Sequence, residues 1–129
     1  MLDSPVHREQ SMNREAKLTI IARAVHETIR AYQAAVGEPE APPWDESGWM
    51  QASTREAVEF ALRNPTPGAQ HESWCESRRR EGWRHGPVKN AALKTHPSLA
   101  PFDELSEAER RKDALIIAVV QALAAALGL

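Results

Sequence analysis

The chain has 129 residues, enough for one domain with one modest hydrophobic core. Sixteen basic and eighteen acidic side chains give a formal net charge of −2, so overall charge predicts neither nucleic acid nor an anionic membrane as a partner. The single cysteine, Cys75, excludes an intrachain disulfide framework and indicates a reducing compartment, for which we expect the cytoplasm.

The N-terminal residues differ in character from the rest. Residues 1–13 carry early charges and no apolar core, so we expect a disordered tail rather than a signal peptide, followed by a single domain over residues 14–129. From Arg14 to Val36 apolar residues recur at alternating steps of three and four, which predicts an amphipathic helix. Gly37 and Pro39 end that helix.

Two further helices are predicted in the middle of the chain. A Pro-rich connector over residues 38–43 leads into the first at Trp44, with Asp45 or Ser47 as its cap, and this helix ends before the Asn-Pro pair at 64–65. The next runs from about residue 69 to residue 80 and is followed by Gly82 as its C-cap glycine. Its apolar face is thin, and we interpret Trp74 as a core residue rather than a ligand platform.

The stretch from Gly82 to Pro101 contains little that can be regular, although residues 83–85 and 87–89 could form a short hairpin. Ser106 and Glu109 have capping-box spacing, which predicts the start of a last helix. The predicted fold is therefore mainly α, a compact bundle of about four helices with a long ordered Gly/Pro-containing loop between helices three and four.

The last helix is apolar almost all round from residue 114 onward. It is too short to span a membrane, which takes roughly 20 apolar residues, and Gln121 interrupts the run. A helix without a polar face has to be buried on more than one side. We therefore expect a homodimer formed through this helix, and no membrane association.

Patterns typical of catalysis are not evident. The sequence has no phosphate-binding Gly-rich motif, and its histidines lack the spacing of a zinc site. We expect no enzyme activity, no metal site and no cofactor. Basic residues are interleaved with acidic ones and no groove-reading helix is evident, so nucleic acid is not an expected partner.

Binding is the better interpretation. Trp83 lies in a rigid Gly/Pro loop beside Arg84, His85 and Lys89, which combines an indole for stacking on a heterocycle with cations for a phosphate. Trp83 could also wedge the loop against the first helix. Trp44 is a second aromatic side chain that could close a pocket, and Tyr32 and His71 could be either ligand contacts or satisfied core groups. The candidate ligand-binding residues are thus Tyr32, Trp44, His71, Trp83, Arg84, His85 and Lys89.

Several segments together resemble one known family. They are Ile21–Glu27, Arg30–Tyr32, Pro42–Asp45, Trp49, Phe60–Pro65, Gly82–Lys89, His96–Leu105 and Lys112–Asp113. This combination resembles the RyR domain, the repeat named after ryanodine receptors, over roughly residues 18 to 120. His85 and Asn90 stand where family members often have tyrosine and aspartate.

The resemblance implies a small-nucleotide-binding module. Its ligand would be an adenine-containing or NAD-derived signal molecule, and it would act as a sensor or sponge in a bacterial or phage setting such as phage defence. The alternative is a ligand-free protein-interaction module that docks through the apolar last helix. A nucleotide-binding module should have Trp83 and the neighbouring cations on the wall of a solvent-connected pocket. A protein-interaction module should have a fully buried Trp83 and exposed apolar area on the last helix.

Overall fold

A computed structural model describes residues 12–46 and 48–129 of the chain. Within these residues the protein forms four α-helices, two single-turn 3-10 helices and one pair of two-residue strands, which confirms the predicted mainly α fold. The elements are α2 (Arg14–Ala35), η1 (Trp44–Glu46), α3 (Gly48–Ala61), α4 (Pro67–Arg80), β1 (Arg84–His85), β2 (Thr95–His96), η2 (Phe102–Glu104) and α5 (Glu107–Leu127).

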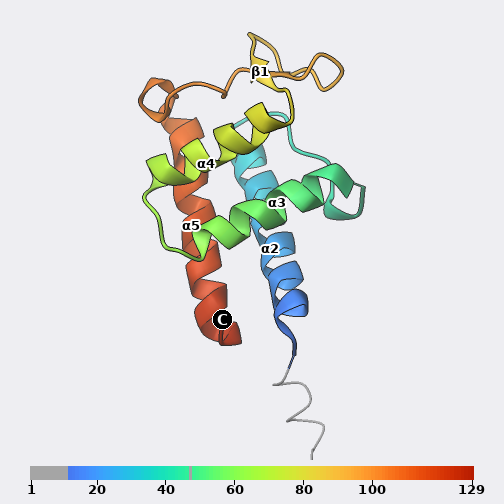
Figure 1. Cartoon of the computed structure of the whole chain (residues 1–129), viewed down its shortest axis with the longest axis vertical. Helices are drawn as coiled ribbons and strands as arrows, with labels where there is room; N and C mark the ends of the chain where they lie inside the picture. Colours follow the sequence, from blue (N-terminus) through green and yellow to red (C-terminus); the bar gives the residue numbers. More distant parts are fainter. Residues whose placement is uncertain (1–11, 47) are drawn as a thin grey trace, which may run out of the picture.

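The two longest helices set the long axis of the molecule. Figure 1 shows α2 and α5 running along this axis in opposite directions, with α3 and α4 lying across them. The loop that follows α4 covers the end of the bundle where α5 begins, opposite the C-terminus. No described helix is long and apolar enough to cross a membrane.

Side-chain caps fix where the helices begin. The side chains of Asn13, Thr66 and Ser106 accept hydrogen bonds from backbone N–H groups three residues on, with lengths of 2.8, 3.2 and 3.2 Å. Because Thr66 is the cap and Pro67 suits the first helical position, α4 starts two residues before the predicted Ala69.

The predicted tail and the predicted cap of α3 are described only in part. Residues 1–11 and Ser47 lie outside the described residues. Asn13, the last residue of the predicted tail, caps α2, and Asp45 lies within η1.

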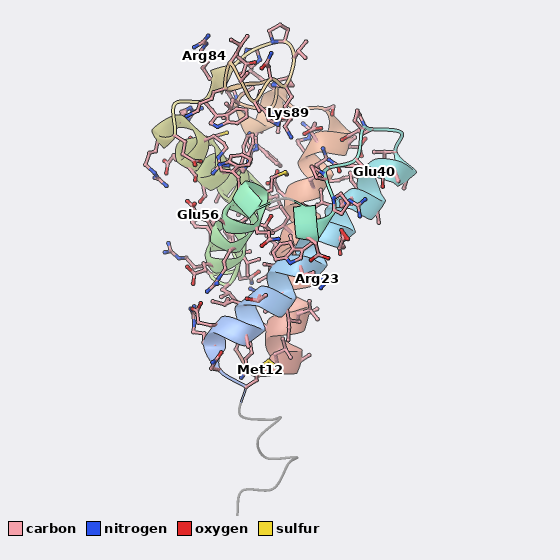
Figure 2. All side chains as sticks on the ribbon, turned by 90° about the vertical axis from the view of Figure 1, so that its right-hand side faces the viewer. Met12, Arg23, Glu40, Glu56, Arg84 and Lys89 are labelled. Atoms are coloured by element: carbon pink, nitrogen blue, oxygen red, sulfur yellow. The ribbon has the colours of Figure 1, made fainter. Side chains whose placement is uncertain are left out.

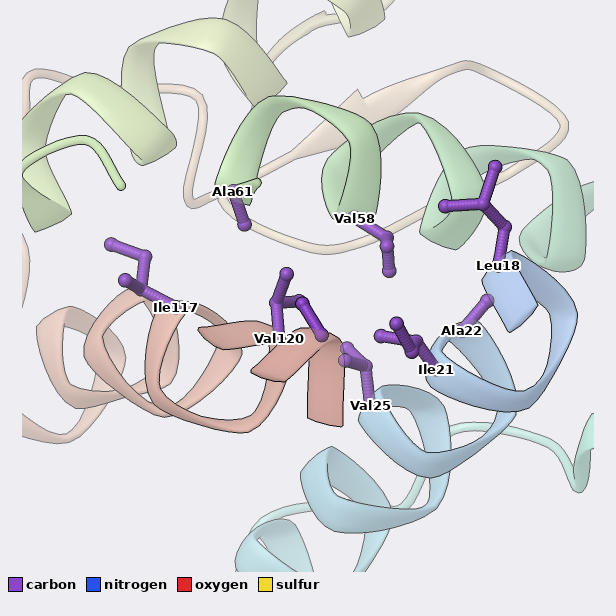
Figure 3. Packing of buried hydrophobic residues seen from close by; sticks show 9 residues of the cluster. Leu18, Ile21, Ala22, Val25, Val58, Ala61, Ile117 and Val120 are labelled. Carbon is purple, nitrogen blue, oxygen red and sulfur yellow. The ribbon is translucent and has the colours of Figure 1, made fainter. Parts of the chain in front are cut away.

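The main hydrophobic core lies between α2, α3 and α5 (Figure 3). Its members are Leu18, Ile21, Ala22, Val25, Val58, Ala61, Ile117, Val120 and Ala124. Larger side chains of α5, including Leu123 and Leu127, pack against this cluster. The outward face of α5 therefore consists mostly of exposed alanines: Ala114, Ala118, Ala122, Ala125 and Ala126.

The predicted hairpin within residues 83–89 is wrong. β1 pairs in parallel with β2, so Arg84 lies opposite Thr95 and His85 opposite His96. Pro87 has no N–H to donate to an antiparallel partner, whereas the Arg84 N–H donates to the Lys94 carbonyl at 2.9 Å.

Gly86 brings these two strands close together. A Cβ at position 86 would lie 2.7 Å from the Cβ of Thr95. The Thr95 hydroxyl also donates to the Val88 carbonyl at 2.9 Å, which fastens the loop to β2 one residue before Lys89.

Candidate functional site

A cavity of about 220 Å³ opens between the four helices and the loop that follows α4. Aromatic side chains form much of its wall: Trp49, Trp74, Trp83, His71 and His96. Charged side chains at the wall are Arg78, Lys89, Glu109, Lys112 and Asp113. Segments far apart in the sequence thus bring aromatic and charged groups to one place.

Three tryptophans from three segments border the cavity. Trp49 of α3 is 47% exposed and stacks on Trp83 of the loop, with ring centroids 5.7 Å apart and planes at 22°. Trp74 of α4 meets the ring of His96 edge-on at 5.0 Å and stacks on His71 at 5.8 Å. Such indoles provide a surface against which a planar heterocycle can stack.

Arg78 joins α4 to α3 beneath the tryptophans. Its side chain is almost completely buried and donates to Ser53 Oγ at 3.0 Å, and its charge is paired with Glu81 at 2.5 Å. The guanidinium carbon lies 4.8 Å from the centre of the Trp49 ring, a cation–π contact. Arg78 Nε and Gln70 Oε1 are the two buried side-chain polar atoms of the described residues without a hydrogen-bond partner. We infer that Arg78 supports the wall and that its charge is already compensated.

His96 is held neutral at the loop side of the cavity. The backbone N–H of Ser98 donates to His96 Nδ1 at 3.0 Å, so the ring proton of the neutral imidazole is on Nε2. Burial, and next the charge of Lys89, lower the pKa of His96 to about 4. At neutral pH His96 is therefore an uncharged hydrogen-bond donor through Nε2.

A charged network lies beside His96. Glu109 accepts from the Ser98 hydroxyl at 3.0 Å and from Lys112 Nζ at 2.9 Å, and Lys112 also donates to Glu38 at 2.6 Å. Burial alone would raise the pKa of Glu109, but the bonds from Lys112 and Ser98 hold it below its usual value. Lys112 is therefore neutralised by two carboxylates.

Lys89 differs from the other cations of the wall. Among the described residues, no carboxylate lies within ion-pair distance of its ammonium group. Although Lys89 is exposed overall, partial burial and the charge of Lys112 lower its pKa. An anion in the cavity would favour the charged form of Lys89 and so offset the burial and the repulsion from Lys112.

Asp113 and His71 form a buried pair on the helical side of the cavity. Asp113 is 7% exposed, and its Oδ2 lies 3.9 Å from His71 Nδ1, too far for a hydrogen bond. Burial, and next the charge of Glu109, raise the pKa of Asp113 to about 7. Asp113 can thus donate or accept a hydrogen bond near neutral pH.

Cys75 approaches His71 but is not placed to react. Its Sγ is 3.3 Å from His71 Nε2, so cysteine, histidine and Asp113 follow one another as in a nucleophile triad. However, His71 Nε2 also contacts the Ala100 carbonyl at 2.8 Å, which requires this nitrogen to donate. Cys75 is fully buried away from the wall, and burial raises its pKa to about 11. These observations favour a structural role for the thiol.

The structure brings three of the predicted ligand residues to the cavity and places four outside its wall. His71, Trp83 and Lys89 line it. The Tyr32 hydroxyl instead donates to the Ala108 carbonyl at 2.8 Å, which ties α2 to α5.

The remaining predicted residues lie elsewhere. Trp44 packs edge-on against His26, with centroids 5.6 Å apart. Arg84 and His85 are exposed on β1, and Figure 2 shows Arg84 at the outer end of the molecule and Lys89 nearer the helices.

The sequence did contain a signal for part of the remaining wall. Glu109, Lys112 and Asp113 are spaced i, i+3 and i+4, so they share one face at the start of α5. The capping-box spacing predicts only a capping role for Glu109. The Ser106 side chain does cap the Glu109 N–H, but the Glu109 carboxylate binds Ser98 and Lys112.

Metal binding finds no geometric support in the part of the chain that the structure describes. There, no group of three or more histidine, cysteine or acidic side chains is arranged to hold a metal ion.

Comparison with known proteins identifies one family. The sequence model of the RyR domain matches residues 59–128, just over half of the chain. This range contains α4, the loop and α5, and so all five charged side chains of the wall. No solved structure matches the chain.

Proposed function

This chain belongs to the RyR domain family, and we propose that it is a small-nucleotide-binding module for an adenine-containing or NAD-derived signal molecule. The observation that carries the proposal is the cavity, which places three tryptophans together with Lys89, a cation without an acidic partner among the described residues. Stacking on aromatic side chains contributes about 1–3 kcal/mol per base, and a lysine contacts phosphate as a point charge.

We further propose that the module acts as a cytoplasmic sensor or sponge for this molecule in a bacterial or phage setting. Trp83 supports a binding role because it is on the cavity wall, although only 7% of its surface is exposed. The half-exposed Trp49 stacked on it supplies the more accessible indole.

The alternative is a protein-interaction module that docks through α5. The exposed alanines of that helix favour it, because small side chains allow another helix to approach closely. In this case the cavity would have no ligand, and binding of a second copy would depend on the α5 face.

A thermal-unfolding panel tests the proposal. The protein is melted by calorimetry with AMP, ADP, ATP, NAD, ADP-ribose, cyclic ADP-ribose isomers and cyclic dinucleotides. A ligand at a hundred times its dissociation constant adds about 2.7 kcal/mol to stability. A panel in which no compound raises the unfolding temperature would contradict nucleotide binding.

Replacing a wall tryptophan then tests where the ligand binds. We expect Trp49→Leu to weaken binding about 5- to 150-fold, the equivalent of one base stack. Trp44→Leu is the matched control, because Trp44 does not line the cavity and its loss should change stability more than affinity. Equal affinity losses in both variants, measured by titration calorimetry, would place the ligand elsewhere.

A further inference from the structure

Within the proposed function, we infer that the ligand is a single nucleotide with one phosphate group, and that Lys89 holds this phosphate. This size and charge of the ligand rest on nucleotide binding, but nucleotide binding can be right where they are wrong.

The cavity volume limits the size of the ligand. At about 220 Å³ the cavity is smaller than the roughly 300–1,000 Å³ of pockets that enclose drug-sized molecules. A dinucleotide has two bases and two sugars, and it would extend beyond the wall.

The loop cannot readily move away to enlarge the cavity. The close contact between Gly86 and Thr95 and the bond from the Thr95 hydroxyl to the Val88 carbonyl fix the segment that carries Lys89. On the opposite side, Asp113 belongs to α5, which packs against the other three helices.

The charges of the wall limit the number of phosphates. Arg78 is paired with Glu81, and Lys112 is shared by Glu38 and Glu109. Lys89 is thus the one wall cation without a carboxylate partner among the described residues.

A single phosphate matches this arrangement. A phosphate monoester carries about −1.5 to −2 charges at neutral pH, and Lys89 can stabilise part of this charge. His96, neutral and protonated on Nε2, adds a donor without adding charge. A second or third phosphate would bring more negative charge near Glu109 without a further unpaired cation.

The test compares ligands that differ only in phosphate number. Titration calorimetry at one pH and ionic strength measures adenosine, AMP, ADP, ATP and NAD, with nicotinamide mononucleotide and the other nucleoside monophosphates to cover the choice of base. We expect a monophosphate to bind about tenfold or more tightly than its nucleoside, and the di- and triphosphates and NAD to bind no more tightly than the monophosphate.

Lys89→Met should remove most of the gain from the phosphate, measured as a smaller ratio of monophosphate affinity to nucleoside affinity. Arg84→Met is the matched control, because Arg84 is an exposed cation of the same loop outside the cavity wall, and it should retain the full gain. Tighter binding of ATP or NAD than of every monophosphate, or a gain that mostly survives in Lys89→Met, would overturn this inference and leave nucleotide binding intact. If no nucleoside or nucleotide binds, both proposals are wrong.

Discussion

Asp113 and His96 line one cavity with pKa values displaced in opposite directions. Folded Asp113 keeps its proton up to about pH 7, whereas the unfolded chain releases it near pH 3.8. Its stabilising contribution is therefore complete below pH 3.8 and is lost as the pH rises through about 7. For His96 the contribution is complete above pH 6.5 and is lost as the pH falls through about 4.

Between pH 4 and pH 6.5 the two contributions oppose each other, each by at most about 1.4 kcal/mol per pH unit. The total contribution of His96 is the smaller of the two, because its pKa is displaced less and its side chain is partly exposed. Relative to the wild type, we expect the stability of Asp113→Asn to fall as the pH is lowered from 6.5 to 4.5, because His96 then acts alone. His96→Gln should show the opposite trend. Urea unfolding at three pH values measures both, and curves parallel to the wild type would contradict these assignments.

At the scale of single residues, the sequence indicated some wall positions and missed others for a physical reason. The sequence indicated Trp83 and Lys89 because an indole and several cations lie close together in one rigid loop. It did not indicate Trp74, because a tryptophan on a helix is equally typical of a core contact. Nor did it indicate Arg78, because an arginine near a helix C-terminus is already explained by its favourable interaction with the helix dipole. Only packing of α4 against α3 and the loop brings them to the cavity.

At the scale of elements, the contact between β1 and β2 depends on Gly86. We expect Gly86→Ala to destabilise the protein by about 1–3 kcal/mol, the usual cost of overpacking, because the new Cβ would meet Thr95 at 2.7 Å. Since this contact positions the loop before Lys89, ligand affinity should also fall. Chemical denaturation and titration calorimetry provide the two readouts.

Gly48→Ala is the matched control, because a Cβ there meets nothing within 4 Å at the start of α3. It should be neutral or slightly stabilising. Combining Gly86→Ala with Thr95→Gly removes the opposing Cβ and should recover part of the loss. A Gly86→Ala protein as stable as the wild type would show that the strands can separate without cost.

The helices were predictable and the strand pair was not. Apolar periodicity predicted the bounds of α2, and the Ser106 cap predicted the start of α5, to within about one residue, because both signals are local. β1 and β2 have two residues each and pair in parallel across an irregular segment. Such short strands have no alternation to detect, so the pairing emerges only from the close approach at Gly86.

At the scale of the whole molecule, the homodimer through α5 remains a prediction. Light scattering at micromolar concentration should give twice the 14.3 kDa of one chain. Ala118→Glu places a charge on the exposed alanine face of α5 and should yield monomers, whereas Ala31→Glu on the exposed face of α2 should not. A mass of one chain at every concentration would contradict the dimer.

The cavity belongs to this same scale, and it explains why the site was only partly predictable. Its wall combines α2, α3, α4, α5 and the loop, and no pattern in the sequence gives the register of four helices against one another. Tyr32 shows the effect, because it is half-buried and was a reasonable ligand residue, yet the position of α5 directs its hydroxyl to the Ala108 carbonyl.

The distribution of the tryptophans has a practical consequence. Three of the four, Trp49, Trp74 and Trp83, border the cavity, and Trp44 does not. Three of the four indole fluorophores of this protein therefore lie where an occupant would stack, whereas Trp44 lies outside the cavity wall. Any molecule that enters should quench or shift the emission, so the unlabelled protein can report its own occupancy during purification, in competition experiments and in cell extracts.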